Sequence, residues 1–214
     1  MSLQTRIGKF GTYIGNTYDS SNALNQEQME VNAKYIALGL YSYGWTKESI
    51  AALLGNMQAE SSINPGRWQS DRVGGDSSGH GYSLVQWTPY IKYTNWCSEE
   101  GYSDPSEMDS ALARIVYEVE NSIQWAGTGA YSGMSFLEFS KSTEEVGYLA
   151  VGLLICYERT ADQSESVQEY RSSLARKWYE FLGGVNLDTT TTKNKKRRKY
   201  KFVLFNRKRR GIYG

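Results

Sequence analysis

The sequence predicts a mainly α-helical domain of the α+β class, with one glycine-rich excursion. Apolar residues recur at helical spacing through most of residues 28–184, and five glycines interrupt this period between residues 62 and 88. The length of 214 residues, with 40% hydrophobic residues and three prolines, allows one substantial core. We therefore expect one domain at residues 28–184, between an N-terminal arm at 1–27 and a basic tail at 185–214.

The arm is rich in Gly, Asn, Ser, Thr and Tyr without a clear period, so we expect it to be irregular. A first helix is predicted at residues 28–42 and a second at 46–61. In the second helix Glu60 follows an apolar stripe and lies in the last turn. Apolar neighbours and the unpaired carbonyls of the helix end both favour a protonated carboxyl group, which a general acid requires. The alternative is a solvated residue that ends an ordinary amphipathic helix.

The glycine-rich residues 62–88 are expected to form a loop or small hairpin beside a cleft. Further helices are predicted at residues 89–100, 105–122, 135–141, 142–155 and 164–182. The helix at 105–122 has Asp104 as its expected N-cap, with Glu107 completing a capping box. The helix at 142–155 is strongly apolar and contains the small residues Ala150 and Gly152. We therefore expect it to form the buried centre of the domain.

The charge is unevenly distributed along the chain. Residues 185–214 hold eleven of the 24 Lys and Arg residues and one acid, Asp188, so this tail carries +10 and the rest of the chain −9. Such a tail is expected to be disordered or extended in isolation and to bind a polyanion. The two cysteines, Cys97 and Cys156, match no metal pattern and are interpreted as buried free thiols, with a single disulfide bridge as the alternative. No apolar run is long enough to span a membrane, and the N-terminus lacks the apolar core of a signal peptide.

Three separated motifs occur in one order: residues 60–69 (ESSINPGRWQ), residues 81–89 (GYSLVQWTP), and Tyr157-Glu158-Arg159. Together they closely resemble the lysozyme domain of bacteriophage tail-tip and tail-knob proteins, from about residue 31 to residue 184. The resemblance implies a lysozyme-like fold that cleaves the β-1,4 bond of peptidoglycan without a cofactor, with Glu60 as the general acid. The family pattern has a proline where this chain has Thr160, which is expected to change the loop and not the chemistry.

Several side chains near these motifs are candidates for binding the glycan. Trp68, Tyr82 and Trp87 offer flat faces for sugar rings, although aromatic residues are more often part of a core. The amide of Gln86 can hold a water or an N-acetyl group, or it can satisfy backbone groups. Tyr157 and Glu158 can reach the cleft floor; alternatively, Glu158 forms an ion pair with Arg159 that fixes the helix end.

The second catalytic carboxylate is harder to assign. An inverting glycosidase needs a base roughly 6.5–9.5 Å from the acid, and a retaining one needs a nucleophile at about 5–5.5 Å. Asp71 and Asp76 are the positional candidates, and we predict Asp76 as the second catalytic carboxylate. The domain can also work without a second carboxylate. His80 has no metal-spaced partners, and no metal-binding signature is present.

These observations predict a muramidase of the phage tail that is made in the host cytoplasm without a signal peptide and opens the cell wall locally during DNA entry. Its expected partners are peptidoglycan glycan strands and other phage tail proteins. Two alternatives remain: a lytic transglycosylase acting on the same bond, and a non-catalytic tail module that is structural or binds the wall. Deleting residues 187–214 is expected to leave hydrolysis of soluble glycan intact while weakening attachment to a particle or wall.

Overall fold

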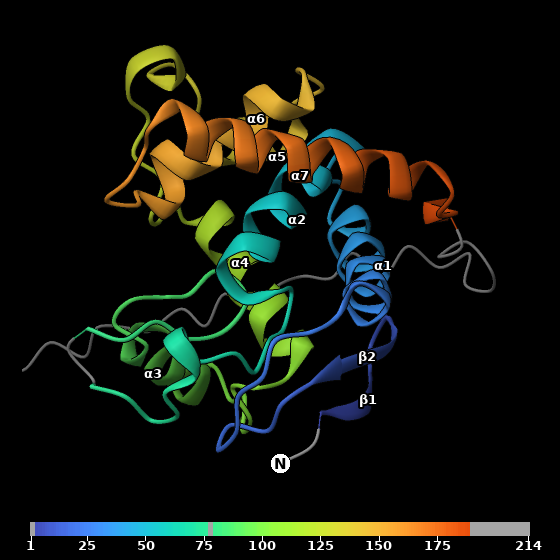
Figure 1. The fold of residues 1–214 in the computed structure, drawn as a ribbon, viewed down its shortest axis with the longest axis vertical. Helices are drawn as coiled ribbons and strands as arrows, with labels where there is room; N and C mark the ends of the chain where they lie inside the picture. Colours follow the sequence, from blue (N-terminus) through green and yellow to red (C-terminus); the bar gives the residue numbers. More distant parts are fainter. Residues whose placement is uncertain (1–2, 77–78, 189–214) are drawn as a thin grey trace, which may run out of the picture.

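The computed structural model describes residues 3–76 and 79–188 of the chain (Figure 1). Most of the predicted basic tail therefore lies outside the described residues. The predicted mainly α-helical fold is confirmed, since seven α-helices and one two-stranded sheet are present in the described parts. None of the helices found there is long and apolar enough to cross a membrane.

The prediction of an irregular N-terminal arm was wrong, because part of the arm forms a β-hairpin. Strands β1 (Gln4–Gly8) and β2 (Gly11–Gly15) pair antiparallel, with Gln4 opposite Gly15 and Gly8 opposite Gly11. The strands are short and rich in glycine, so they lack the alternating apolar pattern that predicts a strand from sequence. Tertiary contacts hold the hairpin in place.

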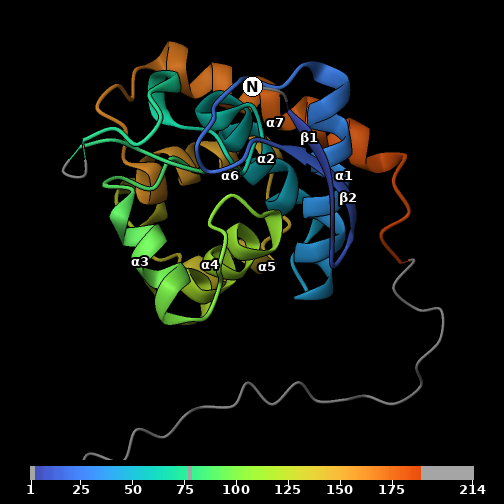
Figure 2. The ribbon, with the colours of Figure 1, turned by 90° about the horizontal axis from the view of Figure 1, so that it is seen from below.

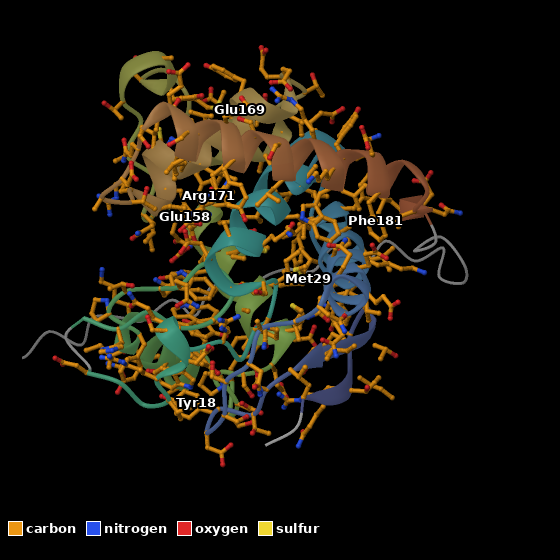
Figure 3. The ribbon with its side chains drawn as sticks, in the orientation of Figure 1. Tyr18, Met29, Glu158, Glu169, Arg171 and Phe181 are labelled. Carbon is orange, nitrogen blue, oxygen red and sulfur yellow. The ribbon has the colours of Figure 1, made fainter. Side chains whose placement is uncertain are left out.

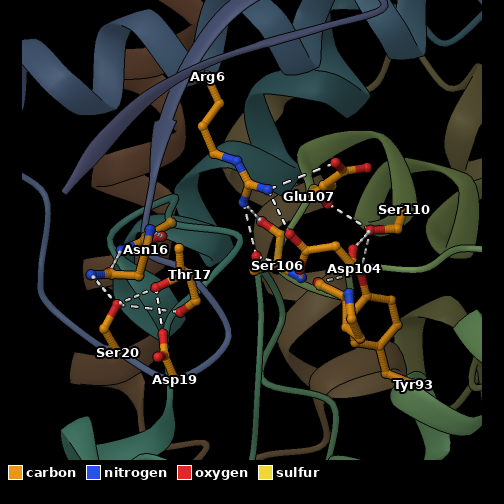
Figure 4. Close-up of polar contacts among 12 residues, drawn as sticks. Arg6, Asn16, Thr17, Asp19, Ser20, Tyr93, Asp104, Ser106, Glu107 and Ser110 are labelled. Carbon is orange, nitrogen blue, oxygen red and sulfur yellow. Dashed lines mark hydrogen bonds and ion pairs between the residues drawn. The ribbon is translucent and has the colours of Figure 1, made fainter.

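Polar side chains attach the hairpin to the helical domain. Arg6 donates hydrogen bonds to Asp104 at 2.5 Å and to the hydroxyl group of Ser106 at 2.8 Å (Figure 4). On the other strand, the amide of Asn32 accepts from the N–H of Ile14 and donates to its carbonyl, both at 2.7 Å. These contacts satisfy backbone groups of a sheet that is too small to be stable alone.

Helices α1 (Gln26–Ser42) and α2 (Lys47–Ser61) agree with the predicted ranges. Asn25 and Gln28 form a capping box at the start of α1, and Thr46 caps α2 by accepting from the N–H of Ser49. Ser62 follows α2 in the left-handed conformation, so the chain leaves the helix directly after Glu60 and Ser61.

The glycine-rich segment is a loop, as predicted, with a short 3₁₀ turn and isolated bridges that pair Tyr82 with Trp68 and with Trp87. It leads into α3 (Ile91–Glu99) and α4 (Met108–Glu120). Asp104 does not cap α4, which begins at Met108. The side chain of Asp104 instead accepts from the N–H and hydroxyl of Ser106 and from Arg6, so it fixes the turn before the helix.

The C-terminal half returns to helices. They are α5 (Phe136–Lys141), α6 (Val146–Leu153), a π-helical turn η3 (Leu154–Glu158) and α7 (Glu165–Gly183). Ser135 and Glu138 form a capping box at the start of α5, where a helix was predicted. Figure 1 shows α7 running along one side of the molecule, with α6 and α2 packed against it.

The helix at the centre is α2 rather than α6, which we expected there. Helix α2 packs against α1, α5, α6 and α7, whereas α6 packs mainly against α2 and α7. Gly55 allows this close packing, because a Cβ atom at that position would lie 2.7 Å from the backbone nitrogen of Ala175 in α7. Figure 2 shows the same helices from below, with the hairpin beside α1. Both cysteines are buried and free, as predicted.

Candidate active site

Glu60 forms an ion pair with α7 at the end of the central helix. Its side chain is 17% exposed, and Nη2 of Arg171 donates to its Oε1 at 2.5 Å. Nη1 of the same arginine donates to the carbonyl of Asn56 at 2.9 Å. Arg171 therefore ties α7 to the last turns of α2 through Glu60 and Asn56. Sequence reasoning missed this residue, although an arginine on the otherwise apolar face of α7 was a usable signal.

Glu158 lies at the end of the π-helical turn that continues α6. Turns of this type are frequent at functional sites. Its Oε1 is buried and has no hydrogen-bond partner among the described residues. Burial raises the pKa of Glu158 well above its usual value; the charges of Glu60 and Glu118 add to this, and that of Arg171 opposes it. Figure 3 shows Glu158 and Arg171 beside each other below α7.

The expected ion pair between Glu158 and Arg159 is wrong. Arg159 ends the turn in the left-handed conformation, with φ of +53°, and its side chain is exposed. None of the ion pairs among the described residues includes Arg159. Glu158 therefore remains inside the protein without the cation that sequence adjacency suggested.

One pocket of about 410 Å³ brings together four of the predicted site residues: Gln86, Trp87, Tyr157 and Glu158. Two of these come from the loop after α2, and the other two from the π-helical turn. Lys92 and Arg159 also line this pocket, and both are exposed. The pocket thus combines an aromatic and amide interior with two cations at the solvent side.

A buried glutamate positions the two aromatic residues of the pocket. Glu118 of α4 is 1% exposed and accepts from Nε1 of Trp87 at 3.1 Å and from the hydroxyl of Tyr157 at 2.5 Å. It also pairs with Nε of Arg114 at 2.8 Å. Burial raises the pKa of Glu118, while the hydrogen bonds from Tyr157, Arg114 and Trp87 oppose this rise. The sequence signal was an Arg and a Glu four residues apart on an apolar helix face.

Gln86 is held in one orientation by its own loop. Its Nε2 donates to the carbonyls of Arg67 at 3.1 Å and Ser83 at 3.0 Å, so the amide satisfies backbone groups. Gln86 also lines the pocket, and its binding of a water or an N-acetyl group remains a prediction. Its Oε1 is buried and has no partner in the described structure. The residue has φ of +51°, a conformation that non-glycine residues rarely adopt and that clusters at functional sites.

Trp68 and Tyr82 lie in the core and not at the pocket. Both have 0% exposure, and their rings are 4.4 Å apart. Nε1 of Trp68 donates to the carbonyl of Tyr18 at 2.8 Å. In this structure their faces are covered by other side chains, and they support the loop that carries Gln86.

The aspartate candidates lie away from this pocket. Asp71 forms an ion pair with Nε of Arg67 at 2.7 Å and accepts from the hydroxyl of Ser21. Asp76 is exposed, and its N–H donates to Nδ1 of His80 at 2.9 Å. Neither aspartate lines the pocket. The role of Asp76 as second catalytic carboxylate remains a prediction, and within the described ranges no cluster of His, Cys, Asp and Glu could hold a metal ion.

Comparisons with known proteins agree with the resemblance. A family model described as phage tail lysozyme matches residues 31–182. Morphogenesis protein 1 of Bacillus phage B103 is 44% identical over 167 residues, which make up 78% of this chain and 43% of that relative. The chain therefore spans less than half the length of this relative.

Proposed function

The chain belongs to the phage tail lysozyme family, and we propose that it is a muramidase that hydrolyses the β-1,4 bond between MurNAc and GlcNAc in peptidoglycan. Glu60 is the proposed general acid. The placement of Glu60 supports this assignment most. Its carboxyl group lies at the end of a buried helix and forms an ion pair with Arg171. The charges of Glu60 and Arg171 both act on Glu158, which lines the pocket.

In the proposed reaction Glu60 donates a proton to the glycosidic oxygen while the bond from that oxygen to the anomeric carbon breaks. Water adds to the anomeric carbon and gives its proton to a base, for which Asp76 is the candidate. A general acid needs a proton on Glu60, so the ion pair with Arg171 has to open before the step. A bound glycan excludes water from the site, and desolvation favours the neutral carboxyl group.

The biological setting is part of the same proposal. The chain is a phage-related, lysozyme-like protein, and its relative is named a morphogenesis protein. We place it in the virion tail, where it opens the cell wall locally so that DNA can enter. Its partners in this setting are glycan strands and other tail proteins, with the basic residues after 188 attached to a polyanion.

The test compares turbidity loss of purified cell walls for the wild type and Glu60→Gln, with Glu120→Gln as a control at an exposed position. Loss of a general acid lowers the rate by about 10²- to 10⁴-fold, whereas the control should equal the wild type. Equal lysis by wild type and Glu60→Gln would refute the assignment. Binding to walls without any lysis by the wild type would indicate a non-catalytic module.

Mass spectrometry of the digested fragments identifies the bond and the reaction. Reducing-end MurNAc is expected; anhydro-MurNAc would indicate a lytic transglycosylase, and reducing-end GlcNAc a glucosaminidase. Asp76→Asn tests the base in the same assay. A base contributes about 10²-fold or more, so an unchanged rate would remove Asp76 from the mechanism.

A further inference from the structure

Two residues that line the pocket, Gln86 and Glu158, each have a buried Oε1 atom without a hydrogen-bond partner among the described residues. Buried polar atoms nearly always have a partner, and an exception calls for a ligand, a water or an ion. The two residues come from different segments, the loop after α2 and the turn after α6, and line one cavity of about 410 Å³. Because both side chains line the same cavity, one ligand group that enters it can meet both of them.

Glu158 supplies a hydrogen-bond donor. The charged groups that act on it are Glu60 from α2, Glu118 from α4 and Arg171 from α7. Burial and the two glutamates raise its pKa well above the usual value, and Arg171 opposes them without reversing the shift. An ionised carboxylate with a buried and unpartnered oxygen would also be very costly. The environment therefore favours the neutral form of Glu158, whose carboxyl group has an O–H to donate.

Gln86 supplies the complementary acceptor. Its NH₂ group already donates to the carbonyls of Arg67 and Ser83, which fixes which end of the amide is oxygen. The remaining oxygen accepts from nothing in the described structure. The left-handed backbone at this residue holds the side chain in its loop. One acceptor and one donor on the same cavity match the N–H and C=O of a secondary amide.

We propose that Gln86 and Glu158 recognise a secondary amide of the wall substrate, whose N–H donates to Gln86 and whose carbonyl accepts from the carboxyl group of Glu158. The inference rests on the proposed action on peptidoglycan. That polymer carries such amides in two places, the acetamido groups of its sugars and the peptide bonds of its stem peptides. Both sources present the same donor and acceptor pair.

Binding is measured by titration calorimetry in the Glu60→Gln background, so that hydrolysis does not disturb the result. Chitotriose carries acetamido groups, and cellotriose is a neutral analogue with hydroxyl groups in their place. A site built to bind an amide should favour chitotriose by about tenfold or more, because the analogue leaves buried groups unpaired. The dipeptide L-alanyl-D-isoglutamine, which has a peptide amide and no sugar, reports the second source.

The variants separate recognition from folding. Glu158→Gln keeps a donor and should retain the preference within about threefold, whereas Glu158→Leu and Gln86→Leu should lose it. Glu120→Gln serves as the exposed control, and near-ultraviolet circular dichroism checks that each variant is folded. A preference for chitotriose identifies the sugar amide, and dipeptide binding that Glu158→Leu abolishes identifies the peptide amide.

Equal affinity of the parent for chitotriose and cellotriose, with no dipeptide binding, would overturn the inference. A preference that survives in folded Glu158→Leu would do the same. These outcomes are distinct from failure of the proposed function, which would appear as undiminished wall lysis by Glu60→Gln. The binding measurement requires no activity and can therefore succeed or fail independently.

Discussion

Replacing Glu118 by glutamine tests how far one buried carboxylate holds the pocket together. The substitution keeps the shape of the side chain. Its oxygen can still accept from Trp87 and Arg114, and its NH₂ group can donate to the hydroxyl of Tyr157. The charge is what disappears, and Arg114, whose side chain is 10% exposed, loses its ion-pair partner.

The expected cost follows from these three hydrogen bonds. A charge-assisted hydrogen bond is roughly twice as strong as a neutral one, so each of the three loses about 1 kcal/mol and the free energy of unfolding falls by about 2–3 kcal/mol. For a domain of this size the melting temperature should fall by about 5–10 °C. Glu118→Leu leaves all three donors unpaired and should cost about 4–6 kcal/mol.

Urea and thermal unfolding followed by circular dichroism measure these costs, and a double-mutant cycle with Arg114→Met isolates the pair. The double variant should cost less than the sum of the single ones by at least about 1 kcal/mol. Arg176→Met is the matched control, because the ion pair of Arg176 with Glu145 has side chains that are 47% and 57% exposed. It should cost under about 1 kcal/mol. A Glu118→Gln cost below 1 kcal/mol, or strict additivity in the cycle, would refute the reasoning.

Other consequences of burial can be measured in the same way. Folding raises the pKa of Glu158 above 4.5, so the folded chain binds more protons than the unfolded chain. Stability should therefore fall as the pH rises above 4.5. Between pH 5 and 8 the urea midpoint of Glu158→Gln should fall less than that of the wild type. Gly55→Ala should lower the melting temperature despite better helix propensity, since overpacking against α7 costs about 1–3 kcal/mol, while Gly183→Ala, with open space around it, should not. Burial raises the pKa of the Cys97 thiol to about 11 and also raises that of the Cys156 thiol. Both thiols are buried, so neither should react with Ellman's reagent at pH 8 before the protein unfolds.

The helices were predictable because their signals are local. The caps at Thr46 and Ser135 and the apolar periods lie within single segments, and the structure follows them. The start of α4 was misplaced because Asp104 has a partner that no local rule contains. Arg6 lies about a hundred positions earlier in the sequence and draws Asp104 into an ion pair. The N-terminal hairpin was missed for the same reason, since its order depends on contacts with α1 and α4.

The candidate site was predictable in its residue types and not in its pairings. The motifs identified Glu60, Gln86 and Glu158, and the structure brings the last two to one pocket. Sequence adjacency suggested that Arg159 would neutralise Glu158, but the chain folds so that Arg171 of another helix faces Glu60. Ion pairs between helices depend on the packing of whole elements, which composition and period do not contain.

Glu60 and Glu158 illustrate how environment separates two identical side chains. Glu60 is partly exposed and forms an ion pair with Arg171. Glu158 has a buried Oε1 atom without a partner, and burial together with the charge of Glu60 raises its pKa well above the usual value. Two carboxyl groups in such different environments can perform different tasks at one pH. A neutral Glu158 suits recognition of an amide, and Glu60 can exchange a proton once a glycan displaces water from its ion pair with Arg171.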